Sequence, residues 1–166
     1  MNLLTVENLT VTLATGSGDA QAVRNLSFNV GHGEILGVAG ESGSGKTMTA
    51  LSMLGLLPYK GKASGSIKFD GREILTSSKR EYRDLRGKEI AMIFQDPMSS
   101  LNPRMSIRQL ISEPLEIHKN LKASEQNFAV EEIITKVGLE VSALDKYPHE
   151  FSGGQRQRIS IARAVI

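Results

Sequence analysis

The octapeptide Gly40–Thr47 limits the possible folds of this chain more than any other stretch. It reads Gly-Glu-Ser-Gly-Ser-Gly-Lys-Thr and so matches the pattern Gly-x-x-x-x-Gly-Lys-Ser/Thr. A continuously apolar run, Ile35–Ala39, precedes it, and a run of helical length and spacing, Lys46–Leu57, follows it and stops at Pro58. This order predicts a strand, a phosphate-binding loop and a helix, with the strand buried on both faces as in a parallel sheet.

Each part of the loop has a chemical reason. Glycines allow the backbone conformations that turn successive amide N–H groups inward, and the helix N-terminus adds about half a positive charge behind them. The lysine then supplies a full charge to the outer phosphates, and the threonine hydroxyl is placed to ligate Mg²⁺. We therefore expect a nucleoside triphosphate with Mg²⁺, bound by Gly40, Glu41, Ser42, Gly43, Ser44, Gly45, Lys46 and Thr47. The loop alone does not choose among kinases, GTPases, motor ATPases and transport ATPases.

Composition places the chain among ordinary soluble proteins. Of its 166 residues, 40% are hydrophobic and 23% charged, which argues against a disordered or fibrous class. Twenty Lys and Arg against eighteen Asp and Glu leave a net charge of only +2, so we do not expect a nucleic-acid partner. Without cysteine there is no disulfide framework, and no apolar run approaches the roughly 20 residues that span a bilayer. We expect a cytosolic location.

The remaining patterns predict an antiparallel β piece that leads into an α/β core. Leu3–Leu13 and Ala22–Val30 resemble half-exposed strands joined by a turn, and Ser66–Phe69 is followed by the tight-turn pair Asp70-Gly71. The short apolar run Ile90–Phe94 resembles a second buried strand.

The C-terminal half has helical periodicity. From Ser106 to about Tyr147 the spacing predicts a helical insert, with Ser106 and Ser124 at helix starts and Gly138 at a C-cap. A last helix is predicted over residues 153–166. Because no stop signal follows it, we expect the chain to be part of a larger domain.

A second motif, Ser152-Gly153-Gly154-Gln155, opens this last helix. Ser152 and Gln155 satisfy a capping box, which explains two of the four residues. Two consecutive glycines are not explained in this way, because each costs a helix about 1 kcal/mol against alanine. Bare amide groups at a helix N-terminus would form a second anion site, so a structural and a functional interpretation both stand.

Together the two motifs resemble the nucleotide-binding domain of an ABC ATPase. The family's signature is usually Leu-Ser-Gly-Gly-Gln, and here Phe151 takes the place of the leucine. The run Met92–Pro103 and the tetrapeptide Tyr147–Glu150 resemble the oligopeptide, dipeptide and nickel importer group. The resemblance implies a P-loop NTPase core, α/β in class, with an antiparallel β piece and a helical insert. It divides the partial domain into residues 1–100, 101–150 and 151–166.

The resemblance also implies site residues and partners. Lys46 and Gln95 would be the catalytic residues, and Thr47 and Gln95 the Mg²⁺ contacts. Two domains would bind head to tail, so that ATP on the loop of one is covered by Ser152, Gly153, Gly154 and Gln155 of the other. Membrane permease subunits would contact residues 95–102 and the insert, with a solute-binding protein upstream. This implies a peripheral position on the cytoplasmic face of the membrane.

Two departures from the family pattern bear on activity. No aromatic residue that could stack on adenine occurs in Val11–Ala14, so we expect adenine to be held either weakly or by packing against Leu13. The family places its Walker B aspartate, catalytic glutamate, D-loop and switch histidine after the signature helix, and the chain stops before them. We therefore expect weak Mg-nucleotide binding and very little turnover by these 166 residues alone, together with poor solubility or dimer formation.

The resulting hypothesis is an ABC-type ATPase subunit that couples ATP binding and hydrolysis to the import of peptides or a related small solute. One alternative is a short regulatory module that pairs with a complete ABC subunit and lends it Ser152–Gly154. Another is a chromosome-maintenance or repair ATPase with the same signature. The importer-like run after Gln95 and the lack of coiled-coil heptads disfavour the latter.

Overall fold

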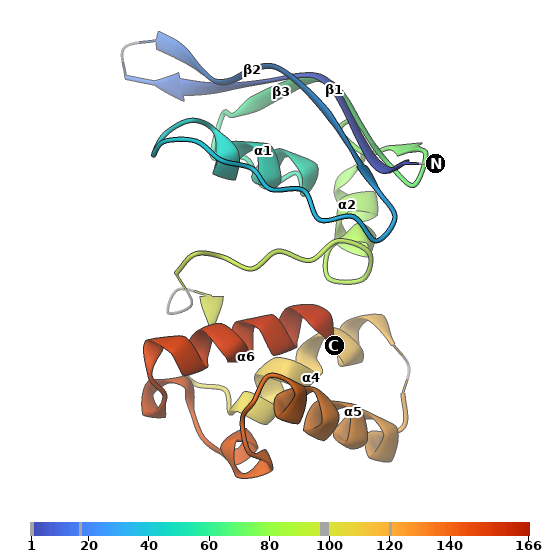
Figure 1. The fold of residues 1–166 in the computed structure, drawn as a ribbon, viewed down its shortest axis with the longest axis vertical. Helices are drawn as coiled ribbons and strands as arrows, with labels where there is room; N and C mark the ends of the chain where they lie inside the picture. Colours follow the sequence, from blue (N-terminus) through green and yellow to red (C-terminus); the bar gives the residue numbers. More distant parts are fainter. Residues whose placement is uncertain (1, 17, 97–99, 120) are drawn as a thin grey trace. The chain divides into compact units, whose positions relative to one another are not determined.

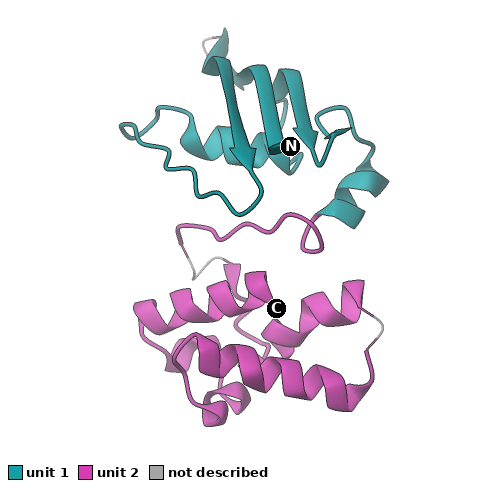
Figure 2. Cartoon of the chain, turned by 45° about the vertical axis from the view of Figure 1, so that its right-hand side comes forward, with its two compact units in different colours: residues 1–85 teal, residues 86–166 magenta. Residues whose placement is uncertain are grey.

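The chain forms two compact units, residues 1–85 and residues 86–166 (Figure 2). The computed structural model describes residues 2–16, 18–96, 100–119 and 121–166 (Figure 1). The first unit carries the sheet and two helices, and the second unit is helical. The division into three parts that the family resemblance implies stays a prediction.

A four-stranded antiparallel sheet in the order β2-β1-β3-β4 forms the first unit. Its strands are β1 (Asn2–Thr15), β2 (Gly18–Gly31), β3 (Lys62–Phe69) and β4 (Arg72–Glu73). The three strands predicted here are therefore confirmed, each longer than expected. Asp70 and Gly71 join β3 to β4 with φ of 48° and 75°, the left-handed pair that a type I′ hairpin turn needs, which confirms the predicted tight turn.

Helix α1 (Lys46–Met53) packs against β1 and β2 and is shorter than the predicted Lys46–Leu57. It ends because Gly55 adopts φ 58°, and the amides of Gly55 and Leu56 then bond back to Ser52 and Leu51 at 3.2 and 2.9 Å. A side chain at position 55 would meet the ring of Tyr82, a buried residue of the short helix α2 (Lys79–Leu85).

Neither of the two apolar runs predicted as buried parallel strands forms a named strand in the described residues. Residues 34–39 have no regular structure, and Ile35 is 96% exposed. In the run Ile90–Phe94, only Ile90 makes a bridge, to Arg86, and Phe94 is 41% exposed. A parallel strand is stable only with hydrogen-bonded neighbours, and none of the described residues supplies a ladder for either run.

The second unit packs three main helices around one core. These are α4 (Ile107–His118), α5 (Ala123–Lys136) and α6 (Gly153–Val165), with 3₁₀ turns η1 (Val141–Asp145) and η2 (Pro148–Glu150) between α5 and α6. The side chains with no more than 2% exposure are Ile107, Leu110, Ile111, Leu115, Val130, Ile134, Leu144, Ile159 and Ala162. The predicted helical insert is confirmed.

The helix ends of this unit follow the predicted signals with one exception. Ser106 caps α4 in a reciprocal capping box with Gln109, and Gly138 ends α5 with φ 76°. The prediction that Ser124 starts α5 is wrong. The N-cap is Lys122, because the carboxylate of Glu125 accepts its backbone N–H at 3.0 Å and stabilises an earlier start.

Candidate nucleotide-binding site

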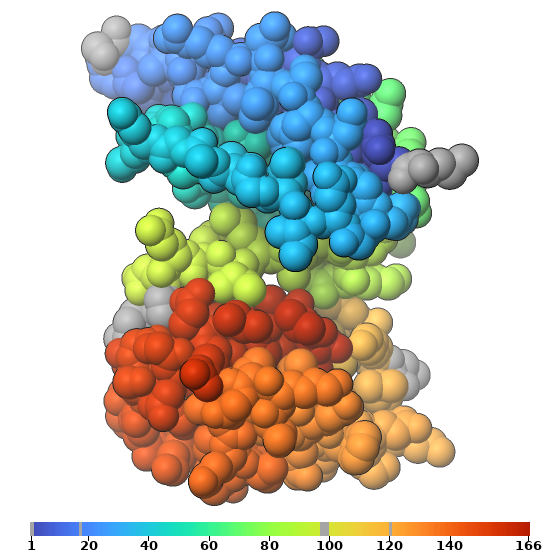
Figure 3. All heavy atoms as spheres, in the orientation of Figure 1, coloured from blue at the N-terminus to red at the C-terminus, as the bar shows by residue number. Residues whose placement is uncertain are grey.

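The loop that precedes α1 lies at the surface of the first unit (Figure 3). Gly43 and Gly45 have φ of 84° and 90°, conformations that residues with a Cβ adopt only with strain. Gly45 also lies against the carbonyl of Ala22 and the side chain of Val23 in β2, so a Cβ there would collide with the strand. The turn and its approach to the sheet therefore both require glycine.

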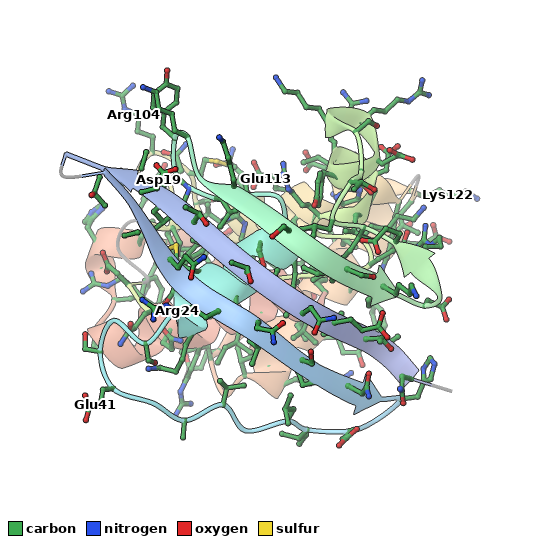
Figure 4. The ribbon with its side chains drawn as sticks, turned by 90° about the horizontal axis from the view of Figure 1, so that it is seen from above. Asp19, Arg24, Glu41, Arg104, Glu113 and Lys122 are labelled. Carbon is green, nitrogen blue, oxygen red and sulfur yellow. The ribbon has the colours of Figure 1, made fainter. Side chains whose placement is uncertain are left out.

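Lys46 turns its ammonium group back over this loop. Its Nζ donates to the carbonyl oxygens of Gly40 and Glu41 at 2.6 and 2.8 Å and to Oγ of Ser44 at 3.2 Å. A Cβ at Gly40 would lie 2.6 Å from that hydroxyl and 3.7 Å from the ammonium. Gly40 therefore lets the Ser44 hydroxyl and the Lys46 ammonium pack close to the loop backbone, whereas the Glu41 side chain extends away from the ribbon (Figure 4).

The N-terminus of α1 is free of side-chain caps. Its N-cap is Gly45, and no side-chain hydrogen bond caps the helix within the described part of the chain. Thr47, in the first turn, is exposed. The helix dipole, the uncapped amides and Lys46 therefore supply positive potential at one place, as the loop motif predicts.

The second motif has the predicted capping box. Oγ of Ser152 accepts the N–H of Gln155 at 3.3 Å, and Oε1 of Gln155 accepts the N–H of Ser152 at 3.0 Å. Gly153 and Gly154 are exposed, and neither has positive φ. A Cβ at either position would have no atom within 4 Å. Packing within the described chain therefore gives no reason for these two glycines.

Three arginines hold α6 in the second unit, and sequence reasoning missed them. Arg156 donates to the carbonyl of Pro148 at 3.4 Å, and Arg158 donates to that of Val137 at 3.2 Å. Arg163 donates to the carbonyl of Ser100 at 3.0 Å and pairs with Glu113 at 2.6 Å. A cation in a helix most often has a solvated head, and the sequence carries no signal for these distant backbone partners.

Gln95 lies at an exposed bend rather than at the end of a buried strand. It belongs to the second unit and Thr47 to the first, so their meeting at one Mg²⁺ stays a prediction. Positions 97–99 of the predicted permease contact lie outside the described residues.

The described residues contain no cluster of three or more His, Asp or Glu side chains that could hold a metal. His149 stacks on Tyr147 with ring centroids 6.0 Å apart.

Comparison with known proteins decides among the families that share a phosphate loop. The family model described as "ABC transporter" matches residues 23–166. The chain belongs to the ABC transporter family. It is 46% identical, over 99% of its length, to the oligopeptide transport ATP-binding protein OppD of Escherichia coli. It is 39% identical, again over 99%, to the dipeptide transport ATP-binding protein DppD of the same organism. It spans 49% and 51% of those relatives, about half of each.

Solved ABC cassettes have the same fold. A dimeric ATP-binding cassette in a post-hydrolysis state, bound to ADP and Pi, superposes with a TM-score of 0.88 at 26% identity. The superposition covers 98% of this chain and 68% of that one. The P-loop ABC fold class predicted from the two motifs is thereby confirmed, and membership of the family implies ATP binding. Among the helices that the structure describes, none is long and apolar enough to cross a membrane.

Proposed function

We propose that this ABC chain is the ATP-binding part of an importer for peptides or a related small solute. The printed names of its relatives concern oligopeptide and dipeptide transport, and these relatives align over nearly the whole chain. The observation that carries the proposal is the pair Gly153 and Gly154, whose open surroundings within this chain are explained by a ligand that approaches from outside.

The residues of the loop fit ATP and Mg²⁺. The ammonium of Lys46 and the uncapped amides of α1 offer cationic and N–H donors at the start of one helix, and such donors suit a phosphate group. Thr47 and Gln95 carry hard oxygen ligands of the kind that Mg²⁺ takes. When bound, Mg²⁺ would neutralise charge on the outer phosphates.

The signature residues would act on a second copy. Ser152 fixes the first turn of α6 through its capping box, and the amides at Gly153 and Gly154 point donors at the anion held by the partner's loop. Two helix N-termini and one lysine would then surround one triphosphate, so ATP would join the two domains. The Gln155 side chain bonds to the backbone of Ser152 and would keep that turn in place.

The remaining partners belong to the same proposal. Membrane permease subunits would contact the Gln95 segment and the helical unit, with a solute-binding protein supplying the cargo. The chain would then lie at the cytoplasmic face of the membrane. We also propose slow hydrolysis by these 166 residues alone. Lys46, Thr47 and Gln95 include no carboxylate that could orient a water for attack, and Glu41 points away from the loop.

The test is the affinity of the full-length protein for Mg-ATP, measured by fluorescence titration. Lys46→Ala should weaken binding about 10- to 100-fold, because it removes a charged donor from the phosphates. Lys62→Ala, a change at an exposed lysine of β3 in the same unit, is the matched control and should leave the affinity unchanged. Equal affinity in the Lys46→Ala protein and the wild type would refute the proposed function.

A further inference from the structure

Strands β1 and β2 each carry an extra residue near their middle, and both extra residues are asparagines. Asn8 on β1 has φ 51° and Asn25 on β2 has φ 47°, left-handed conformations that asparagine tolerates better than most residues. The register of the two strands shifts by one residue at Asn8 and shifts back at Asn25. The regular pairs around these positions are Val6 with Phe28, Leu9 with Leu26, and Val11 with Val23. The two asparagines therefore form a compensating pair of β-bulges.

Each bulge is held by a hydroxyl group of the opposite strand. Thr10 is the single β1 residue opposite the bulge on β2, and its Oγ1 accepts the N–H of Asn25 at 3.1 Å. Ser27 is the single β2 residue opposite the bulge on β1, and its Oγ accepts the N–H of Asn8 at 2.8 Å. A bulge leaves its extra residue out of the regular ladder. The hydroxyl acceptor therefore fixes where that residue lies.

The bulge at Asn25 lies next to the part of β2 that supports the phosphate loop. A Cβ at Gly45 would collide with the carbonyl oxygen of Ala22 and would lie 3.0 Å from Cγ2 of Val23. Val23 is 7% exposed, and Asn25 follows it by two positions (25 − 23). Because closely packed groups transmit displacements, a change in the bulge would move the strand against which Gly45 lies.

The direction of the first amides of α1 depends on this support. Gly45 is the N-cap of the helix, and its carbonyl accepts the N–H of Thr49 at 2.8 Å and the Thr49 hydroxyl at 3.0 Å. Without the Thr10 hydroxyl, the bulge would lose an interaction that favours it over regular pairing of the two strands. The Ala22 carbonyl would then shift, and the loop and the helix start would shift with it.

We propose that Thr10 is a positioning residue for the phosphate loop. Its hydroxyl holds the bulge at Asn25, and the bulge fixes Ala22 and Val23 against Gly45. The amide donors at the start of α1 are thereby aimed before a nucleotide arrives. Thr10 acts through the backbone of β2 and not through contact with the nucleotide. This inference rests on the proposed function, because it concerns the phosphates that the loop would bind.

The affinity of the full-length protein for Mg-ATP tests the proposal. Thr10→Val keeps the shape of the side chain but loses the hydroxyl. It should raise the Kd about three- to tenfold, because one hydrogen bond is lost from the support of the loop. Thr10→Ala lacks the same hydroxyl and should raise the Kd by a similar factor. Thr10→Ser keeps the hydroxyl and should bind Mg-ATP within about twofold of the wild type.

Ser27→Ala is the matched control. It removes the hydroxyl that holds the other bulge, which the Leu9–Leu26 pair separates from the bulge at Asn25. Both Ser27→Ala and Thr10→Val should lower the urea concentration at half-unfolding, but only Thr10→Val should change the Kd. The proposal is overturned if Thr10→Val binds Mg-ATP as tightly as the wild type, or if both variants raise the Kd by the same factor.

Hydrogen exchange of the loop gives a second measurement that needs no nucleotide. Without ATP, the backbone amides of residues 40–47 should exchange several-fold faster in the Thr10→Val protein than in the wild type or the Ser27→Ala protein. Unchanged exchange in the Thr10→Val protein would overturn the proposal. Wild-type protein that does not bind Mg-ATP, but whose loop exchange responds to Thr10→Val as expected, would instead overturn the proposed function alone.

Discussion

Glycine is needed at some positions of this chain for the backbone conformation and at others for the approach of a ligand. Measurements of stability can distinguish these two cases. Gly138 has φ 76°, and a Cβ there would lie 2.7 Å from Nη1 of Arg158. Gly138→Ala should lower the free energy of unfolding by about 1–2 kcal/mol, because it forces alanine into the left-handed region beside that guanidinium. Urea denaturation followed by circular dichroism measures the change.

The control is Gly153→Ala, at a position with open surroundings and no positive φ. It should leave stability unchanged or raise it by up to about 1 kcal/mol, since alanine is the better helix former. Equal destabilisation by both substitutions would contradict the assignment of Gly138 to structure and Gly153 to ligand approach.

The sequence predicted the structural roles of single residues correctly where those roles depend on close neighbours in the chain. The left-handed glycine at 138 and the capping serines at 106 and 152 follow from neighbours within a few positions. Arg163 could not be predicted, because its partner Ser100 lies 63 positions away. Nothing in the sequence distinguishes this arginine from a solvated one.

Among the elements, the β3–β4 hairpin depends on one carboxylate. Oε2 of Glu73 accepts the Ser66 hydroxyl at 2.5 Å, and Oε1 accepts the amides of Ile67 and Leu75 at 3.1 and 2.9 Å. Desolvation opposes ionisation of this group. The hydrogen bonds outweigh it and hold the pKa of Glu73 below its ordinary value of 4.5.

Removing this charge should have a pH-dependent effect. Because the pKa is lower in the folded chain, the carboxylate stabilises the fold above pH 4.5, and this contribution is lost as the pH falls through the folded-state pKa. Glu73→Gln should cost up to about 1 kcal/mol at pH 7, since the side chain is largely exposed. Urea denaturation should show a smaller difference in the free energy of unfolding between the Glu73→Gln protein and the wild type at pH 3 than at pH 7. A constant difference would contradict this account.

Element predictions succeeded where a segment supplies its own hydrogen bonds or pairs with a close neighbour. The helices and the β1–β2 and β3–β4 hairpins are of this kind. The runs Ile35–Ala39 and Ile90–Phe94 failed as strands for the opposite reason, since apolar content predicts burial but supplies no partner for the backbone. The same limit applies to Phe128, which has helical spacing with its apolar neighbours yet is 70% exposed.

For the whole molecule, the exposed apolar run after β2 predicts self-association. Ile35 is 96% and Val38 62% exposed, and an unpaired apolar segment is a template for another chain. The 166-residue chain should therefore sediment as a dimer or larger species at micromolar concentration, and the double change Ile35→Lys and Val38→Lys should shift it toward monomer.

Ile117→Lys is the control for this prediction, because Ile117 is 66% exposed on α4, in the other unit. It should leave the sedimentation profile unchanged. Monomeric wild-type chain, or an equal response to both sets of substitutions, would contradict a specific role for the run at residues 35–38.

The bonds that Lys46 makes to its own loop have a consequence for ligand choice. An anion can accept hydrogen bonds from the Lys46 ammonium only by displacing the oxygens of Gly40, Glu41 and Ser44. These three loop oxygens are neutral acceptors. Replacing them with an anionic ligand therefore becomes more favourable as the negative charge on the ligand's terminal oxygens increases. The loop should therefore select ligands by the charge density of their terminal phosphate, independently of any contact with the base or sugar. We therefore expect the loop to bind a nucleoside monophosphate more weakly than a nucleoside triphosphate.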